Sequence, residues 1–270
     1  CTPLPLPKPT HDLPLGVVAR RRRSALDFDP RTPPMERIEV VQLLDFATRD
    51  WRTDWRGNFH GPATEYERGA DFVTLYLYVH RVSGCQPGVY RWCRSSRMLE
   101  QLYRGNVERL AAFLSLEQTL AGNSCFTVSM IADLTRAAQA LGNRGYRCVY
   151  FEAGAIGQRL YLGAEALNWN ATGIGAFYDD DVHRYLGFLE EGDSPVNASL
   201  QAAEQEALVM SNSPASRHTG AHDLIPPEPA SKDRVNEVEA APHKDPRTLP
   251  QQVIYHFAVG RAVPDTRIEA

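Results

Sequence analysis

Residues 144–177 read "RGYRCVYFEAGAIGQRLYLGAEALNWNATGIGAF", and this stretch decides the fold. Apolar residues recur every three or four positions from 151 to 168, which predicts a long helix with one buried face. The stripe on that face consists of Ala153, Ile156, Leu160, Ala164 and Leu167. A helix of this length with an apolar stripe has to pack against a larger core, so we expect it to be central to the domain.

Three glycines, Gly154, Gly157 and Gly163, interrupt this helix. Each glycine in a helix interior costs up to about 1 kcal/mol relative to alanine. We therefore expect a close approach to the helix backbone, either by another helix or by a flat ligand. The segment Gly173 to Ala176, "GIGA", is predicted to be a turn that presents backbone N–H groups.

Length and composition describe an ordinary globular chain. It has 270 residues, 43% hydrophobic and 23% charged, with a formal net charge of −4. The arginine run at 20–23 is one local cluster on a slightly acidic chain, which argues against nucleic acid as a partner. No apolar run reaches the roughly 20 residues of a membrane span, so we expect no membrane insertion.

Cysteine usage favours a reducing compartment, and we expect a cytoplasmic protein. The five cysteines are scattered and form no C-x-x-C pair, so neither a disulfide scaffold nor a metal site is predicted. They are Cys1, Cys85, Cys93, Cys125 and Cys148. Lone histidines such as His60, His80 and His183 show no metal-ligand spacing either.

The remaining patterns organise the chain into one domain, 16–270, after a proline-rich lead or linker at 1–15. A start at Cys1 with such a lead suggests a piece of a longer protein. Helical spacing follows in "MERIEVVQLLDFATR" and "NVERLAAFLS", and "ADFVTLYLYVHRV" with "GVYRWC" predicts a hairpin. "SCFTVSMIADL" and "QQVIYHFAVGRAV" are predicted to be buried strands, which gives an α+β sandwich with a central mixed or antiparallel sheet flanked by helices.

Residues 190–250 break this pattern. They are rich in proline, serine, alanine and charge, which predicts a disordered insertion with at most a short helix near 200–210. We expect its removal to leave the fold intact. Three functions stay open for it: a lid, a partner-binding segment or an inert excursion.

Three motifs in order carry a resemblance. "RRSALDFD" near the start, the 144–188 region and "IYHFAVGRAVPDTRIE" at the end together resemble the nitroreductase-like flavoproteins, and more narrowly the SagB-type dehydrogenases, which include azoline oxidases. The resemblance covers almost the whole chain except the lead and the insertion. It implies a homodimer with FMN sites at the subunit interface and the glycine-dotted helix in the dimer core.

The resemblance also implies the residues that bind the cofactor. Arg22 and Ser24 match the first two places of an Arg-x-Ser-x-Arg/Lys phosphate motif, and Arg267 resembles the basic residue of the tail. Leu26 stands where the second basic residue is expected, unless Arg20 or Arg21 substitutes for it. The residues expected near the flavin ring are Gln158, Gly173, Ile174, Gly175 and Ala176.

Other positions depart from the family's pattern. The loop "GPATEYERGADF" replaces a segment that usually lines the flavin, and Ala140 and Leu141 stand where azoline oxidases have a Lys-Tyr pair. Neither side chain is a general acid or base, so we do not expect azoline oxidation. Tyr146, Tyr178 and His183 are candidates for acid–base work, although each is more often structural.

Two functions of different classes follow. The first is an FMN-dependent oxidoreductase that passes a hydride through flavin N5, in a two-step ping-pong cycle, to or from an unknown small-molecule or peptide substrate. The second is a degenerate, flavin-poor partner or scaffold, as one half of a tandem or heteromeric oxidoreductase. The glycine turn, Arg22, Ser24 and Gln158 favour the first, whereas Leu26 and the lost Lys-Tyr pair favour the second.

Overall fold

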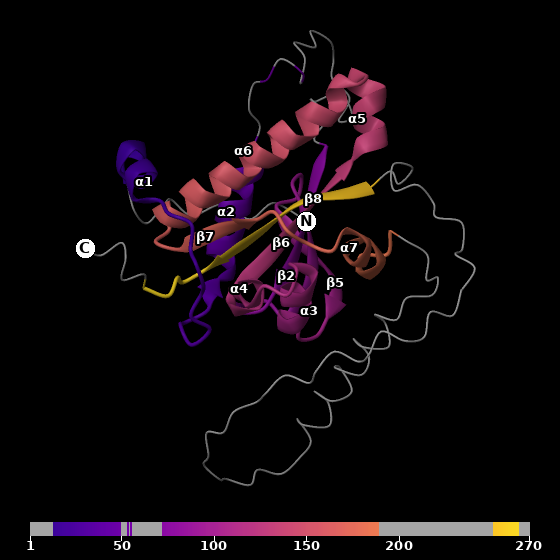
Figure 1. The fold of residues 1–270 in the computed structure, drawn as a ribbon. Coiled ribbons are helices and arrows are strands. Elements are labelled where there is room, and N and C mark those ends of the chain that lie inside the picture. Colours follow the sequence, from indigo (N-terminus) through magenta and orange to yellow (C-terminus); the bar gives the residue numbers. More distant parts are fainter. Residues whose placement is uncertain (1–12, 50–52, 54, 56–71, 189–250, 265–270) are drawn as a thin grey trace, which may run out of the picture. The chain divides into compact units, whose positions relative to one another are not determined.

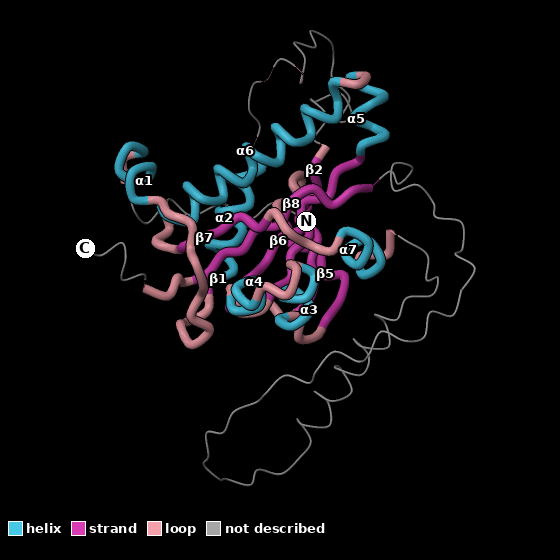
Figure 2. Tube along the Cα trace, in the orientation of Figure 1, coloured by secondary structure: helices cyan, strands magenta, loops and turns pink. Residues whose placement is uncertain are grey.

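The computed structural model describes residues 13–49, 53, 55, 72–188 and 251–264. The expected insertion at 190–250, residues 1–12 of the expected lead and most of the loop at 61–72 lie outside these residues, as does Arg267. Within the described part the secondary structure is an α+β arrangement around one sheet (Figures 1 and 2). The predicted α+β fold class is confirmed.

The sheet has six strands in the order β5-β4-β2-β6-β8-β7, and every neighbouring pair is antiparallel. The strands are β2 (Val73–Val79), β4 (Gly88–Cys93), β5 (Met98–Arg104), β6 (Phe126–Asp133), β7 (Asn170–Ile174) and β8 (Gln251–Gly260). β8 lies between β6 and β7, so the strand after the insertion completes the sheet, as predicted. A separate parallel pair joins β1 (Met35–Glu36) to β3 (Val82–Ser83).

The helices cover both faces of this sheet. They are α1 (Leu15–Arg21), α2 (Arg37–Thr48), α3 (Glu108–Leu114), α4 (Thr119–Asn123), α5 (Leu134–Leu141), α6 (Arg144–Ala166) and α7 (Asp179–Tyr185). The long helix α6 and its neighbour α5 lie on one side of the strands, whereas α3, α4 and α7 lie on the other (Figure 1). The core between α2, α6 and the sheet is apolar, and Phe126, Val128 and Phe257 are fully buried in it.

Helix α6 begins earlier than the periodicity predicts. It runs from Arg144 to Ala166, seven residues upstream of the predicted start, and buries the predicted stripe from Ala153 to Ala164. Its first turn packs against α5, where the Cβ of an alanine at Gly145 would come within 2.2 Å of the Ala137 carbonyl oxygen. Glycine at position 145 allows the first turn of α6 to pack this closely on α5. The apolar spacing from 151 onward gives no sign of this turn.

The segment from Gly173 to Ala176 differs from its prediction. Gly173 and Ile174 are the last two residues of strand β7, and only Gly175 and Ala176 lie beyond it. β7 pairs with β8 through Gly173 and Phe257 and through Ile174 and His256. The prediction of a four-residue turn was wrong because pairing with β8, which is distant in sequence, extends the strand over both residues.

Candidate functional site

Helix α6 and strand β8 line an open cavity of about 300 Å³, which we call the tyrosine cavity. Its lining residues are Tyr150, Ala153, Gly154, Gly157, Gln158 and Tyr161 from α6, and Ile254, Tyr255 and Phe257 from β8. A volume near 300 Å³ is at the small end of the range for ligand pockets. The walls are apolar and aromatic, with the Gln158 amide and the tyrosine hydroxyls as polar groups.

A bulge in β8 accounts for one wall of this cavity. The pairing of β6 with β8 shifts register between Met130 and Ile131, so that one residue of β8, Ile254, is extra. In a regular strand Ile254 and Tyr255 would point to opposite faces, whereas a bulge lets neighbouring residues share a face. Both residues line the tyrosine cavity.

The three helix glycines play different parts. A Cβ at Gly163 would come within 2.6 Å of Leu43 Cδ1, so this glycine serves the packing of α6 on α2. A Cβ at Gly157 would lie 3.7 Å from the Phe257 ring, in ordinary van der Waals contact, and a Cβ at Gly154 would meet no heavy atom within 4 Å among the described residues. Close approach by a helix therefore explains Gly163, the Phe257 ring covers the buried Gly157, and only Gly154 leaves a flat strip of backbone open to the cavity.

A second cavity of about 330 Å³, the arginine cavity, lies beside the N-terminal segment. Its lining residues are Arg21, Arg23, Ser24, Ala25, Leu26, Glu165, Asn170, Ala262, Val263 and Pro264. Arg21 forms an ion pair with Glu165 at 3.2 Å, so these two charges cancel. Arg23 then gives the lining its net positive charge. Leu26 is 58% exposed here, so the place of the second basic residue is apolar.

The N-terminal segment is fastened to the sheet by backbone pairing. Ser24 forms a parallel bridge with Ala171 of β7, and the Ala25 amide donates to the Ala171 carbonyl at 3.0 Å. Phe28 pairs with Ala262 just after β8. These contacts hold residues 22–28 against the outer edge of the sheet, next to the C-terminal end of α6.

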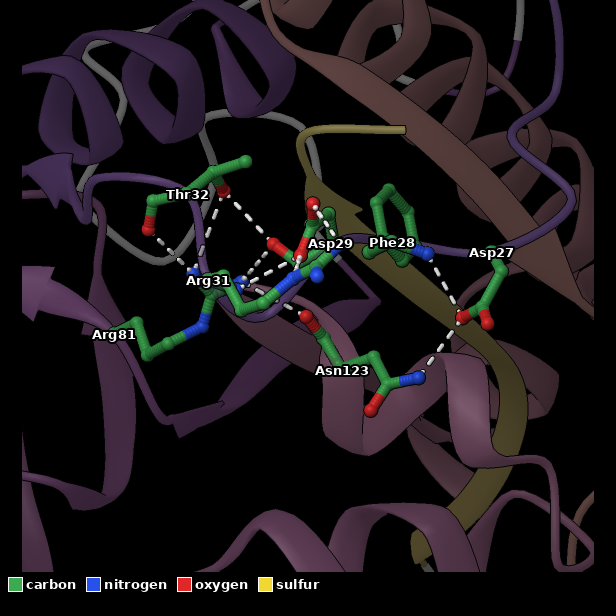
Figure 3. Close-up of polar contacts among 7 residues, drawn as sticks. All are labelled: Asp27, Phe28, Asp29, Arg31, Thr32, Arg81 and Asn123. Atoms are coloured by element: carbon green, nitrogen blue, oxygen red, sulfur yellow. Dashed lines mark hydrogen bonds and ion pairs between the residues drawn. The ribbon is translucent and has the colours of Figure 1, made fainter. Parts of the chain in front are cut away.

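Arg81 and Asn123 hold the stretch from Asp27 to Thr32 in place (Figure 3). The Arg81 guanidinium donates to the Thr32 carbonyl at 2.9 Å and to the Asn123 carbonyl at 2.8 Å. The Asn123 amide in turn donates to the Asp27 carboxylate at 3.0 Å. Hydrogen bonds from Arg31 lower the pKa of Asp29 to about 2, so this carboxylate stays charged at neutral pH.

Tyr161 brings several predicted residues together. Its hydroxyl lies 2.9 Å from the Ser24 hydroxyl and accepts a hydrogen bond of 2.8 Å from the Gly173 amide. The Arg22 guanidinium carbon lies 4.9 Å from the centroid of the Tyr161 ring. The structure therefore gathers Arg22, Ser24 and Gly173 around a tyrosine that the sequence analysis did not select.

Other predicted positions lie near this group. Gln158 lines the tyrosine cavity one turn before Tyr161. A Cβ at Gly173 would come within 2.2 Å of the Tyr255 hydroxyl, so only glycine leaves Tyr255 in its place. The Gly173 N–H that was predicted to be bare is already bonded to Tyr161, and neither Ile174 nor Gly175 nor Ala176 is among the residues that line the two cavities.

The acid–base candidates are placed elsewhere. His183 is buried, its Nε2 accepts the Val253 amide at 2.9 Å, and burial lowers its pKa. Tyr178 packs against Phe113, and Tyr146 lies beside Tyr150 with ring centroids 4.9 Å apart. None of the three lines either cavity.

Tyr150 and Tyr255 of the cavity stay protonated at neutral pH. Burial and the neighbouring Tyr146 raise the pKa of Tyr150 to about 12, and burial raises the pKa of Tyr255 as well. Both hydroxyls are therefore neutral hydrogen-bonding groups. The cavity itself suits an uncharged, flat ligand.

Flavin mononucleotide (FMN) has a planar ring system and a phosphate, and each part can be compared with one of the two cavities. The flat strip at Gly154, beside the Tyr255 and Phe257 side chains, fits a planar aromatic group. At the arginine cavity Ser24 and Arg23 provide donors suited to a phosphate, and the Arg22 guanidinium lies outside the lining, over the Tyr161 ring. Glu165 and Leu26 weaken that end, but the ion pair with Arg21 offsets the Glu165 charge. The residues present therefore fit FMN.

The fold of this chain is shared with solved structures named as putative nitroreductases. No family model matches the chain. Over 180 residues it is 28% identical to "Putative nitroreductase MJ1384" of Methanocaldococcus jannaschii, an alignment that covers 66% of this chain and 87% of that protein. This similarity supports a place in the nitroreductase-like family.

Solved structures share the fold. A crystal structure from Anabaena variabilis named as a putative nitroreductase matches 92% of this chain with a TM-score of 0.58 and 22% identity, and the chain spans 38% of its length. One from Ralstonia eutropha with the same description matches 98% of this chain and 90% of its own, with a TM-score of 0.57 and 15% identity. The Escherichia coli microcin synthetase McbBCD complex with truncated pro-MccB17 has a TM-score of 0.54 at 15% identity, over 97% of this chain and 78% of the matched chain.

No described helix is both long enough and apolar enough to cross a membrane. The described residues also hold no group of three or more His, Cys, Asp or Glu side chains placed to bind a metal ion.

Proposed function

We propose that this protein is an FMN-dependent oxidoreductase of the nitroreductase-like family, in or near its SagB-type branch. The observation that carries the proposal is the pair of cavities joined at Ser24 and Tyr161, one flat and aromatic, the other polar with arginines. The similarity to the archaeal nitroreductase-named protein supports the same class. The organic substrate remains open, and small molecules and peptides both fit the proposal.

In this proposal the predicted residues hold the cofactor. Arg22, Ser24 and Arg267 bind the phosphate, with Arg23 as a further cation at the arginine cavity. Gln158 borders the ring in the tyrosine cavity, and the Gly173 backbone joins the site through its hydrogen bond to Tyr161. FMN would supply hydride transfer through its N5, which no side chain of this site can supply.

The chain's own residues bind, orient and exclude water. Gly154 lets the ring approach the helix backbone, and Phe257 and Ile254 keep the neighbouring wall apolar. Since the pKa of Tyr150 is about 12, the cavity provides hydroxyl donors rather than a strong acid. We therefore assign orientation to these tyrosines and leave proton delivery to the substrate or to solvent.

Family members form dimers around the corresponding helix, and we propose the same for this chain. The α6 surface carries exposed aromatic side chains at Tyr146, Tyr150 and Phe151, which are 58%, 43% and 55% exposed. Exposed apolar patches of this kind mark interaction sites. The partner is either a second copy or a related domain in a tandem or heteromeric assembly.

A second function is kept because one observation favours it. Leu26 and Glu165 line the cavity that the phosphate would enter, and both are poor partners for an anion. A degenerate partner module that binds flavin weakly would tolerate these residues. The two functions differ in whether the purified protein contains flavin.

The test uses FMN affinity, measured by the quenching of flavin fluorescence on titration of the protein. Arg22→Ala is expected to weaken binding by about 10- to 150-fold, the equivalent of one hydrogen bond between charged groups. Arg109→Ala is the control, because Arg109 is an exposed arginine on α3 outside both cavities. Equal affinity of the two variants would overturn the assignment of Arg22, and no FMN binding by the unmodified protein would favour the partner module.

A further inference from the structure

Tyr161 lines one cavity and contacts a residue that lines the other. It lies on α6, lines the tyrosine cavity and packs edge-on against Phe257 with ring centroids 4.8 Å apart. Its hydroxyl reaches Ser24, which lines the arginine cavity. The side chain therefore stands at the junction of the two cavities, where α6, β7 and the N-terminal segment meet.

The hydrogen bonds of this hydroxyl have a preferred direction. The Gly173 amide can only donate, so it occupies one lone pair of the Tyr161 oxygen. The single phenolic hydrogen is then available for Ser24, and a phenol is the more acidic of the two hydroxyls. With Tyr161 as the donor, the Ser24 oxygen acts as acceptor and its own hydrogen is left to donate elsewhere.

We propose that Tyr161 is a positioning residue that fixes Ser24 as a hydrogen-bond donor toward an anionic group in the arginine cavity. The inference rests on the proposed function, in which that anion is the phosphate of FMN. The chain of donors runs from the Gly173 amide to Tyr161, from Tyr161 to Ser24 and from Ser24 to the anion. Successive hydrogen bonds polarise one another, so the chain strengthens the last donor.

The same chain links the two ends of the proposed cofactor site. Gly173 lies near the end of β7 beside Tyr255, and Ser24 is held to β7 through its bridge with Ala171. Tyr161 joins both to α6, and the Arg22 guanidinium lies over its ring. Loss of the hydroxyl alone leaves the ring contacts with Arg22 and Phe257 in place, which makes Tyr161→Phe a clean substitution.

The first test needs no cofactor. Amide hydrogen exchange at Gly173, followed by NMR on the unliganded protein, is expected to be at least about tenfold faster in Tyr161→Phe, because the amide loses its acceptor. Tyr103→Phe is the control, since Tyr103 is an exposed residue on β5 at the opposite edge of the sheet. Unchanged exchange at Gly173 in Tyr161→Phe would overturn the inference.

The second test measures FMN affinity and the absorption band of bound FMN. Tyr161→Phe is expected to weaken binding by about tenfold, and Ser24→Ala to weaken it similarly. The double variant should be little weaker than either single variant, because both remove the same chain of bonds. The bound FMN band should also shift in Tyr161→Phe and stay unchanged in Tyr103→Phe.

Additive losses in the double variant would show that Tyr161 and Ser24 act separately, and would overturn the inference. If the unmodified protein binds no FMN, the proposed function fails. Exchange at Gly173 still decides whether the Gly173 amide donates to Tyr161, the first bond of the chain, so the two failures are distinguishable.

Discussion

Two glycines on one helix separate the effects of packing from those of ligand binding. Gly154 faces open space at the tyrosine cavity, whereas Gly163 lies against Leu43 and Phe46 of α2. Replacement by alanine removes the same helix penalty, up to about 1 kcal/mol, at both positions. Any difference between the two variants therefore reports what the new methyl group meets.

We predict that Gly154→Ala is more stable than Gly163→Ala by about 1 to 3 kcal/mol, the cost of overpacking a core. Urea denaturation measures this difference. For FMN affinity the order is reversed: Gly154→Ala weakens binding because its methyl group occupies the flat strip, and Gly163→Ala leaves binding unchanged. An unaltered affinity in Gly154→Ala would contradict the placement of the flavin against α6.

At the scale of elements, one buried carboxylate joins the central helix to the sheet. Glu152 on α6 is fully buried and accepts hydrogen bonds from the Phe72 amide at 3.0 Å and the Val73 amide at 3.4 Å. It also pairs with Arg94, whose side chain is 20% exposed, at 3.3 Å. The start of β2 is thereby fixed against the middle of α6.

Glu152→Ala is expected to lower the free energy of unfolding by about 3 to 5 kcal/mol, because it leaves a largely buried arginine without this carboxylate. Glu100→Ala is the matched control. Its pair with Arg91 is 2.6 Å long, but the two side chains are 40% and 47% exposed. A surface pair of this kind contributes about 0 to 1 kcal/mol. Similar losses in both variants, measured by urea denaturation, would contradict the structural role of Glu152.

Local patterns predicted the elements better than the site. The apolar stripe of α6 and the strands β2, β4, β6 and β8 follow from spacing and β-branched content, which depend on neighbouring residues. The start of α6 and the bulge at Ile254 depend on contacts with α5 and β6, which no local window contains.

The same limit explains Tyr161. Its hydroxyl is linked to residues 137 positions upstream and 12 positions downstream, and nothing in the sequence around it marks this role. Ser24 and Arg22 were found because a motif names them. The available signal was that Tyr161 follows Gln158, a predicted ring contact, by one helical turn. The sequence analysis did not use this signal.

For the molecule as a whole, two buried histidines predict a dependence of stability on pH. Burial lowers the pKa of His80 and of His256 to about 3, far below the value of about 6.5 for an unfolded chain. Below about pH 6.5 the unfolded chain therefore binds protons that the folded protein does not. The free energy of unfolding falls as the pH drops from about 6.5 toward 3.

His80→Leu isolates one of these contributions, because neither ring nitrogen of His80 has a hydrogen-bond partner among the described residues. The unmodified protein should lose up to about 1.4 kcal/mol more per pH unit between pH 6 and 4 than this variant. Urea denaturation at several pH values measures both slopes. Parallel slopes would contradict a neutral, buried His80.

The central claim is that this chain holds FMN and passes electrons through it. An anaerobic titration of the purified, FMN-incubated protein, followed by visible absorption, tests it most directly. We predict about one FMN per chain, with a flavin band that bleaches when a nicotinamide or dithionite reductant is added and returns when an organic electron acceptor follows. A protein that stays colourless after incubation with excess FMN would contradict the claim and leave the partner module as its function.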